Sequence, residues 1–370
     1  GPHDLIPSFR PKSNKHLPPL AIWQPMPKGS GMAEQESTGR GAPTIYDVAR
    51  AAGVAPSTVS RAFSRPGRVN AATANRIQQV AEELGYRNTP LTLAPQRTDS
   101  KLVSLVVSDI TNPVFFPIIR GAESIAAANG FTMVLSDSQE SSRLEREALD
   151  RALYSVDGIV LATSRMSDSA IRAIAQRKPL VQLNRIVSDV PSVVTDNHHG
   201  IQQAVEHLVD LGHEKVTYLA GPEASWADGV RWAALRTAAA ESEMRVKRIG
   251  PLTPTIMGVE AAIDEFLASP TSAVIAYNDL LAIGFMKQLQ SRDWKIPQQV
   301  SVIGFDNSYG SDLVTPPLTT IAASLRALGT TAMTMVLDQI RDKKVGSLQP
   351  TLLPTRLIIR DSTGPANGRG

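Results

Sequence analysis

The hydrophobic pattern from Lys101 onward predicts the buried strands of a parallel sheet. Short continuous apolar runs, LVSLVVSDI, FTMVLSD, VDGIVLAT and KPLVQLNR, alternate with helical stretches such as FPIIRGAESIAAANG. Strands that are buried on both faces and alternate with helices indicate a parallel sheet with right-handed crossovers. The alternation then restarts with KVTYLAG, SAVIAYND and VSVIGFD. Two successive units of this kind predict a body of two α/β lobes with a cleft between them.

Polar residues follow many of these predicted strands. In open α/β sheets, ligands bind beyond the carboxyl ends of the strands. In this chain the polar residues at those ends are Asp109, Asn112, Asn184, Asp196, Asn278 and Asp306. The pattern therefore predicts a ligand site at the edge where the strands end.

The segment before the body follows a helical pattern, with two short helices in the stretch TIYDVARAAGVAPSTVSRAF. The first helix is expected from Ile45 to about Ala52, ending at Gly53. The second is expected to begin at Pro56, because the N–H group that proline lacks is not needed at the first position of a helix.

A small hydrophobic core is expected where these helices meet. Val48 and Ala49 can pack against Val59, and Phe63 lies one turn beyond. The helical pattern continues to about Asn88, and one face of ANRIQQVAEELGY carries Ile77, Val80, Ala81 and Leu84, with Gly85 as a C-terminal stop.

Two short helices joined by a tight turn form a helix-turn-helix. In such a motif the N-terminal end of the second helix meets base edges in the major groove. The exposed positions of this helix are expected to be Pro56, Ser57, Ser60 and Arg61. Ser and Arg donate hydrogen bonds to bases and phosphates, and Arg can contact guanine in a bidentate manner. A helical hairpin with a purely structural role is the alternative that the pattern leaves open.

Composition narrows the class of protein. The 370 residues are 42% hydrophobic and 20% charged, which is typical of a globular protein of two or three domains. There is no cysteine, so disulfides and thiolate metal sites are excluded and a reducing compartment fits. No apolar run approaches the length of a membrane span, and the first residues lack a secretory-signal pattern. We therefore expect a cytoplasmic protein with no membrane partner.

Charge is distributed unevenly along the chain. Residues 1–101 contain 13 Lys and Arg against 7 Asp and Glu, whereas the remainder contains 25 against 28. A basic front attached to an acidic body indicates that the front binds a polyanion. A solvated basic surface without a partner would give the same counts, so charge alone does not decide between the two.

The helical segment carries a family resemblance. An Asp-Val-Ala helix, a Gly-Val turn and a Thr-Val-Ser-Arg recognition helix occur at residues 47–49, 53–54 and 58–61. With them, residues 44–87 resemble the DNA-binding headpiece of the lactose-repressor/galactose-repressor (LacI/GalR) family. The stretches SDITNPVFF, DGIVL, VEHLVDLGHEKVTYLAGP, AVIAYNDLLAIGFM, VSVIGFDN and PPLTTI resemble the family's effector-binding body, so the resemblance extends to about Asp361.

This resemblance implies a transcriptional regulator, of the repressor type, whose operator affinity is controlled by a small effector. The implied fold is a small all-α helix-turn-helix headpiece followed by a two-lobed α/β body like that of periplasmic sugar-binding proteins, with parallel sheets in both lobes. The expected segments are a disordered, partly tag-derived extension (1–43), the headpiece (44–88), a hinge linker (89–100), the effector-binding domain (101–361) and a flexible tail (362–370). Within the body we expect an N-lobe of about 101–196 and 323–350, and a C-lobe of about 197–322 and 351–361.

The resemblance also implies two sets of site residues. The DNA-binding set is Thr44, Tyr46, Pro56, Ser57, Thr58, Ser60, Arg61, Ser64, Arg68, Leu93 and Pro95. The effector-binding set is Phe115, Asn184, Ser225, Trp226, Arg231, Asn278 and Asp306. Planar bidentate groups suit paired hydroxyls and an aromatic face suits a ring, so a saccharide or a nucleoside is expected as effector. The other expected partners are near-palindromic double-stranded operator DNA and a second copy of the chain in a homodimer.

Structural roles compete with ligand binding at several of these positions. Asp306 and Asn278 can cap the helices after their strands, Arg231 can pair with Asp228, and Phe115 can belong to the core.

Other chemistry is less well supported. The stretch DNHHG favours a helix cap at Asp196 followed by exposed histidines over a metal site. No nucleophile elbow or Walker loop occurs, so neither an enzyme nor a cofactor is expected. A solute-binding receptor built on the same body, without a DNA role, is the alternative function.

The chain departs from the family pattern at a few places. Ala55 stands where Ser is usual, which removes a helix cap or a phosphate contact. Ser64 replaces a usual Asn, and Ala323 lies where many members carry a polar pocket residue. In the linker, Pro95 falls on the leucine that the family presses into the minor groove, and proline inside a helix costs about 3 kcal/mol. A weak hinge helix is therefore expected, which inserts Leu93 or Pro95 weakly or not at all. The alternative is a hinge that keeps the family role with Leu93 as the wedge.

Overall fold

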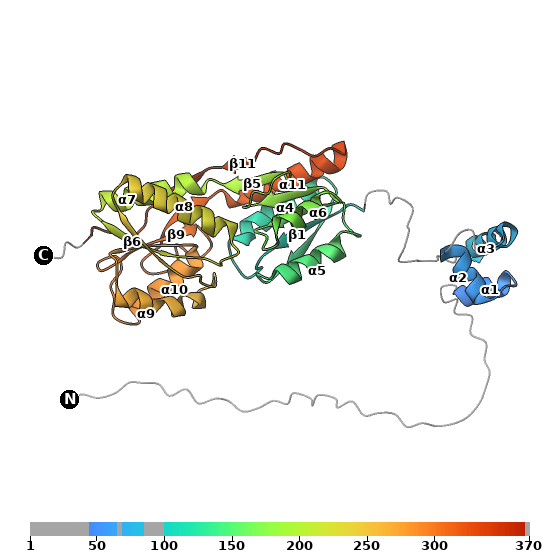
Figure 1. Cartoon of the computed structure of the whole chain (residues 1–370), viewed down its shortest axis with the longest axis horizontal. Helices are drawn as coiled ribbons and strands as arrows, with labels where there is room; N and C mark the ends of the chain where they lie inside the picture. Colours follow the sequence, from blue (N-terminus) through green and yellow to red (C-terminus); the bar gives the residue numbers. More distant parts are fainter. Residues whose placement is uncertain (1–43, 65–68, 85–99, 367–370) are drawn as a thin grey trace, which may run out of the picture. The chain divides into compact units, whose positions relative to one another are not determined.

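The computed structural model of the chain describes residues 44–64, 69–84 and 100–366 (Figure 1). The chain divides into two units between Gln96 and Arg97, a helical headpiece and a larger α/β body. In the ranges described, no helix is long and apolar enough to cross a membrane.

The headpiece consists of α1 (Ile45–Ala51), α2 (Pro56–Ser64) and α3 (Ala71–Leu84). Val48 and Val59 are fully buried, and Phe63 packs against their cluster, which confirms the expected contact between the first two helices. The turn between them passes through Gly53, whose positive φ of 63° suits a residue without a Cβ. On the apolar face of α3, Ile77 and Ala81 are buried, whereas Leu84, the last residue of the helix, is 40% exposed.

The N-lobe of the body contains a six-stranded, wholly parallel sheet. Its strands in spatial order are β11 (Thr351–Leu353), β5 (Ser192–Thr195), β4 (Leu180–Leu183), β3 (Gly158–Ala162), β1 (Leu102–Val107) and β2 (Thr132–Asp137). Its helices are α4 (Phe115–Ala128), α5 (Ser142–Ala152), α6 (Asp168–Ala175) and α11 (Leu325–Asp342) (Figure 1).

The C-lobe contains a second six-stranded sheet with the same kind of strand order. Its strands are β12 (Thr355–Ile358), β10 (Thr319–Ala323), β9 (Ser301–Asp306), β8 (Ala273–Ala276), β6 (Lys215–Leu219) and β7 (Arg245–Ile249). Its helices are α7 (Asn197–Asp210), α8 (Trp226–Glu241), the short η1 (Met257–Val259), α9 (Glu260–Ala268) and α10 (Asp279–Gln290). The sheet is parallel except for β12, which pairs with β10 in the antiparallel direction.

The chain crosses between the lobes after β5, after β10 and after β11. The first crossing lies at Asp196, where it was expected. The third lies later than expected, because β11 extends the N-lobe sheet beside β5 before the chain crosses at Pro354. Residues 351–353 therefore belong to the N-lobe, and Ala323, as the end of β10, belongs to the C-lobe.

The segment after residue 361 is packed rather than free up to Ala366, which corrects the expectation of a flexible tail. Ser362 is fully buried, and its hydroxyl accepts from the Thr319 amide and donates to the Val302 carbonyl. The Ala366 amide donates to the Leu211 carbonyl at 2.8 Å. These bonds satisfy backbone groups of the C-lobe, so 362–366 are part of that lobe; residues 367–370 lie outside the described ranges.

Close contact between α4 and α11 shapes the N-lobe beneath the cleft. A Cβ added to Gly329 would clash with the carbonyl oxygen of Ile118, and one added to Gly121 would clash with that of Arg326. Two glycines therefore let these helix backbones approach each other. The same stretch of α4 carries Phe115, so the packing also positions a residue expected in the ligand site.

Gly329→Ala should lower the free energy of unfolding by about 1–3 kcal/mol, because the added methyl group has no space between α4 and α11. Gly229→Ala is the matched control, since Gly229 also lies in a helix but has nothing within 4 Å of an added Cβ. This control should instead raise the free energy of unfolding by up to about 1 kcal/mol, because Ala has a higher helix propensity than Gly. Urea unfolding of both variants measures the difference, and equal effects would show that the glycine contact is not tight.

Candidate effector site and DNA-binding surface

The second helix of the headpiece presents polar residues to solvent. Pro56, Ser57, Ser60 and Arg61 are exposed, as expected, while Val59 between them is fully buried. This arrangement leaves the N-terminal part of α2 free to enter a groove of DNA. Ala55 precedes the helix without a side-chain cap, and its carbonyl accepts from the backbone of Thr58 and Val59.

The structure describes only some of the remaining DNA-binding candidates. Tyr46 is 65% exposed, and Thr58 is half-buried. Thr44 is exposed, but its hydroxyl donates to Asp47 at 2.6 Å as part of the capping box at the start of α1. The side chain of Ser64, together with Arg68, Leu93 and Pro95, lies outside the described residues.

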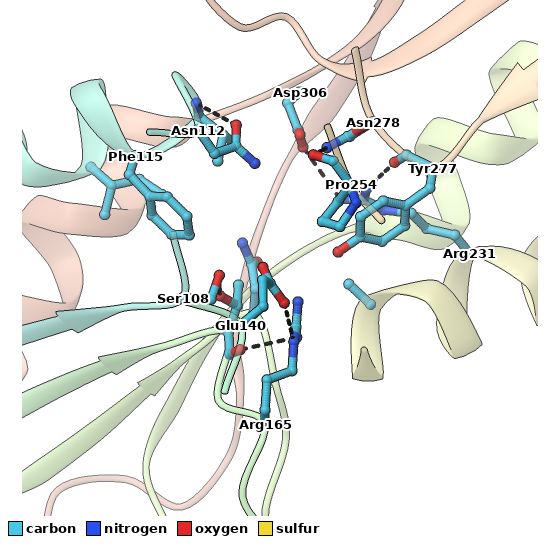
Figure 2. A pocket seen from close by; sticks show the side chains of 15 residues that line it. Ser108, Asn112, Phe115, Glu140, Arg165, Arg231, Pro254, Tyr277, Asn278 and Asp306 are labelled. Atoms are coloured by element: carbon cyan, nitrogen blue, oxygen red, sulfur yellow. Dashed lines mark hydrogen bonds and ion pairs between the residues drawn. The ribbon is translucent and has the colours of Figure 1, made fainter. Parts of the chain in front are cut away.

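A cavity of about 470 Å³, counted with the space at its open side, lies between the two lobes of the body (Figure 2). From the N-lobe it is lined by Ser108, Asn112, Val114, Phe115, Ile118, Glu140, Thr163, Arg165 and Asn184, and from the C-lobe by Ala227, Arg231, Pro254, Tyr277, Asn278 and Asp306. Five of the seven expected effector residues are in this set.

Arg231 on α8 is the centre of the C-lobe wall. Its guanidinium donates to Asn197 Oδ1 at 2.9 Å, to the Tyr277 carbonyl, and to Asp306 Oδ1 at 3.3 Å. It also lies 3.5 Å above the Phe305 ring. The alternative pairing with Asp228 is wrong, because both oxygens of that carboxylate are taken by Tyr218, Gly221 and Arg248.

Asp306 ends β9 at the cavity with an unusual backbone. Its φ of 104° is in the region that residues with a Cβ rarely adopt. Burial raises the pKa of its carboxyl to about 6, although the nearby Arg231 guanidinium acts in the opposite direction. A carboxylate of this kind can accept hydrogen bonds from ligand hydroxyls.

Tyr277 is a lining residue that the sequence analysis missed. Its hydroxyl lies 3.0 Å from Ser225 Oγ, and its ring packs over Gly221, where an added Cβ would come within 2.6 Å of the ring. Tyr277 directly follows β8, so the rule that ligands bind at strand ends would have included it. It supplies the aromatic face on this lobe.

Arg165 and Glu140 form a second missed group, on the N-lobe side. Arg165 Nε donates to Glu140 Oε2 at 2.6 Å, and the Arg165 side chain is only 5% exposed. Burial alone would lower the pKa of Arg165, but Tyr277 and Glu140 raise it overall. Figure 2 shows Arg165 and Tyr277 extending toward each other from the two sides of the cavity. A pair separated by 25 positions leaves no local signal in the sequence.

Phe115, Asn112 and Asn184 complete the N-lobe wall. Phe115 is 2% exposed and belongs to the core cluster of the lobe, so it serves both packing and the cavity. Asn184 Oδ1 accepts from the amide and hydroxyl of Thr195, which leaves its Nδ2 as the donor toward a ligand. Asn112 Oδ1 accepts from the Val114 amide in the same way.

Three expected effector residues have structural roles. Asn278 lines the cavity, but its Oδ1 caps α10 through the Leu281 amide at 2.9 Å. Ser225 and Trp226 are not among the residues that line this cavity, and their role in effector binding stays a prediction. Ser225 caps α8 through the Asp228 amide, and Trp226 is the first residue of that helix, next to Ala227, which does face the cavity.

The DNHHG stretch forms a helix cap, as expected. Asp196 Oδ1 accepts from the His199 amide at 3.0 Å, and His198 and His199 are exposed. Within the described residues, no group of three or more His, Cys, Asp or Glu side chains could hold a metal ion. Asp109 is also away from the cavity wall, with its Oδ1 bonded to Thr111.

A helix-turn-helix unit joined to a two-lobed, ligand-binding α/β body defines the class of ligand-responsive DNA-binding regulators. A family model of bacterial regulatory proteins, lacI family, matches residues 44–88, and one of the periplasmic binding protein-like domain matches residues 205–363. The HTH-type transcriptional repressor CytR of Escherichia coli K12 is 33% identical over 332 residues, which are 87% of this chain and 96% of CytR. The chain belongs to the LacI family of transcriptional regulators, and it is a regulator rather than an enzyme.

Solved structures agree with this family. The lac repressor dimer bound to operator and the anti-inducer ONPF is 26% identical, with a TM-score of 0.65 over 88% of this chain and 100% of that one. A LacI family regulator from Enterococcus faecium with bound ribose is 29% identical, with a TM-score of 0.65 over 72% of this chain and 100% of that one.

Proposed function

We propose that this regulator represses transcription from an operator bound by its headpiece, and that an uncharged saccharide or nucleoside in the cavity controls that binding. It would act in the cytoplasm, where operator DNA is found. The ribose in the related Enterococcus faecium structure supports a ligand of this chemical class.

The observation that carries this proposal is the pairing of charges around the cavity. Among the lining residues, all of them in the described part of the chain, Arg165 and Arg231 are the basic side chains. Arg165 lies 2.6 Å from a Glu140 oxygen, and Arg231 lies 3.3 Å from an Asp306 oxygen. A phosphorylated ligand would need guanidinium groups without carboxylate partners. Neutral hydroxyl groups can instead bridge such pairs, because they both donate and accept.

Each lining group has a role in this proposal. Asp306 accepts from ligand hydroxyls and Arg231 donates to them, while Asn184 donates from the opposite lobe. The rings of Phe115 and Tyr277 provide apolar faces for a sugar ring or a base. Ser225 acts indirectly, through its hydrogen bond to the Tyr277 hydroxyl. Trp226 stays a predicted ligand residue, one helix position before Ala227, which lines the cavity.

The effector proposal is tested by thermal unfolding of the full chain with free sugars, nucleosides and their phosphorylated forms. A ligand that binds only the native state raises the melting temperature. We expect an uncharged ligand to raise the melting temperature and its phosphorylated form to leave the melting temperature unchanged. Arg231→Ala should abolish the shift, since losing one partner of a buried charged hydrogen bond costs about 2–5 kcal/mol.

The matched control for Arg231→Ala is Arg236→Ala, because Arg236 lies on the same helix but is exposed. That variant should keep the full ligand response, and both variants should keep basal DNA binding. An unchanged ligand affinity in Arg231→Ala would refute the assignment, and a shift with the phosphorylated forms alone would refute the charge argument.

DNA recognition is assigned to Ser57 and Arg61 at the exposed front of α2, with Leu93 and Pro95 as candidate wedges of the linker. Arg61→Ala should weaken binding to an operator selected by the wild-type protein by roughly 1–3 kcal/mol and relax the base preference at one position. Binding is measured at fixed salt against operator and random duplexes. An equal loss on both duplexes would mean that Arg61 contacts phosphate only.

We expect the working species to be a homodimer on a near-palindromic site. One headpiece reads few base pairs, and two-fold protein symmetry matches operator symmetry. Sedimentation at micromolar concentration should give a dimer; a monomer or a stable tetramer would contradict this expectation.

A further inference from the structure

The turn that carries Asp306 into the cavity is held in a strained conformation. Asp306 and the next residue, Asn307, have φ values of 104° and 53°. Such conformations cost on the order of 1–3 kcal/mol each and persist only where surrounding bonds determine them. The direction of the Asp306 carboxylate therefore depends on whatever holds this turn.

One side of the turn is held by Asp279, the first residue of α10, which is 1% exposed. Asp279 Oδ2 accepts from the Ser308 amide at 2.7 Å and from the Ser308 hydroxyl at 3.1 Å. Its Oδ1 accepts from the Thr320 hydroxyl at 2.6 Å, and the same hydroxyl accepts from the Asn307 amide at 3.3 Å. A Cβ on Gly304 would clash with Asp279 Oδ1, so β9 leaves space for this carboxylate.

The other side of the turn is held by Arg360, in the segment after β12. Arg360 Nη2 donates to Asn307 Oδ1 at 2.8 Å, and its Nη1 donates to the Leu318 carbonyl at 2.6 Å. The turn is therefore held by hydrogen bonds to Asp279 and to Arg360, which are far apart in the sequence. Asp279 also interacts electrostatically with Asp306.

Asp279 and Asp306 form a coupled pair of buried acids. Burial, followed by the charge of Asp306, raises the pKa of Asp279 to about 7, while hydrogen bonds from Thr320 and Ser308 oppose the rise. Burial raises the pKa of Asp306 to about 6 against the effect of Arg231. The charged groups around the pair are Arg231 from α8 and Arg360 beside the turn. Two such acids titrate together rather than separately.

We propose that Asp279 is a positioning residue of the effector site, which holds the strained turn so that the Asp306 carboxylate points at the ligand. The inference rests on the proposed function, because Asp306 must contact the effector for its direction to matter. Asp279 does not line the cavity and acts through Asp306.

The pair makes effector affinity depend on pH in a definite direction. An ionised Asp306 accepts hydrogen bonds from ligand hydroxyls better than a protonated one, so affinity falls as the pH drops through about 7 and 6. Asp279→Asn removes the group whose pKa is about 7, so only the titration of Asp306, with a pKa of about 6, remains. The midpoint of the pH profile should therefore move to lower pH, an effect that a purely structural role would not produce.

The test uses the full chain with D-ribose and adenosine as probes, one sugar and one nucleoside. Asp279→Asn and Thr320→Val should each lower the affinity of the bound probe by roughly tenfold, as expected for a lost hydrogen bond to a charged group. Thr217→Val is the matched control, since Thr217 is also a fully buried strand threonine of this sheet but pairs with Thr271 at 2.9 Å. It should leave the affinity unchanged.

Hydrogen exchange of the peptide that contains Ser308 gives a readout without any ligand. The backbone amide hydrogens of this peptide should exchange faster in Asp279→Asn and in Thr320→Val than in the wild-type protein. In Thr217→Val they should exchange at the wild-type rate. If this peptide exchanges as slowly in Asp279→Asn as in the wild-type protein, or if the midpoint of the pH profile is the same in both, the inference is overturned. Either result would leave the proposed function intact. If neither probe binds the wild-type protein, the proposed function fails for these ligands, and the exchange measurement still decides whether Asp279 holds the turn.

Discussion

The burial of the Arg231 guanidinium is the constraint around which the C-lobe wall is built. A buried charge is tolerated only where partners compensate for its lost hydration. Those partners come from the start of α7 through Asn197, from the end of β8 through Tyr277, and from the end of β9 through Asp306. One side chain thus fixes three elements that are distant in the sequence. A wall held by hydrogen bonds among its own residues loses less entropy when a ligand binds.

Backbone strain lies at the same edges of the two sheets. Six non-glycine residues at the carboxyl ends of strands have positive φ values, namely Gln139, Glu140, Thr163, Asn184, Asp306 and Asn307. Four of the six line the cavity. Left-handed conformations turn a side chain out of the strand direction, and they cost free energy that the core of each lobe offsets. The strain is therefore part of how the strands present polar groups to the cavity.

The sequence predicted the lobes well because fully buried strands must be apolar, and the strand-end rule then found Asn112, Asn184, Asn278 and Asp306. It failed where a residue's role depends on pairing across the fold. The partnership of Arg165 with Glu140 has no periodicity, and Ser225 was assigned by resemblance although its hydroxyl caps a helix. The late crossing after β11 was missed since three residues are too few to show a strand pattern.

The crossing segments limit how ligand binding can alter the body. The Asp196 amide donates to the Leu353 carbonyl at 2.9 Å, and the Thr355 hydroxyl donates back to the Asp196 carbonyl at 2.9 Å. The lobes are tied together here, so a change in their arrangement opens or closes the far side of the cavity. A ligand shifts such an equilibrium only by its difference in affinity for the two arrangements. The bonds of Arg231 lie within one lobe. Arg165 instead faces Tyr277 of the opposite lobe across the cavity, so its contacts depend on how the two lobes are arranged.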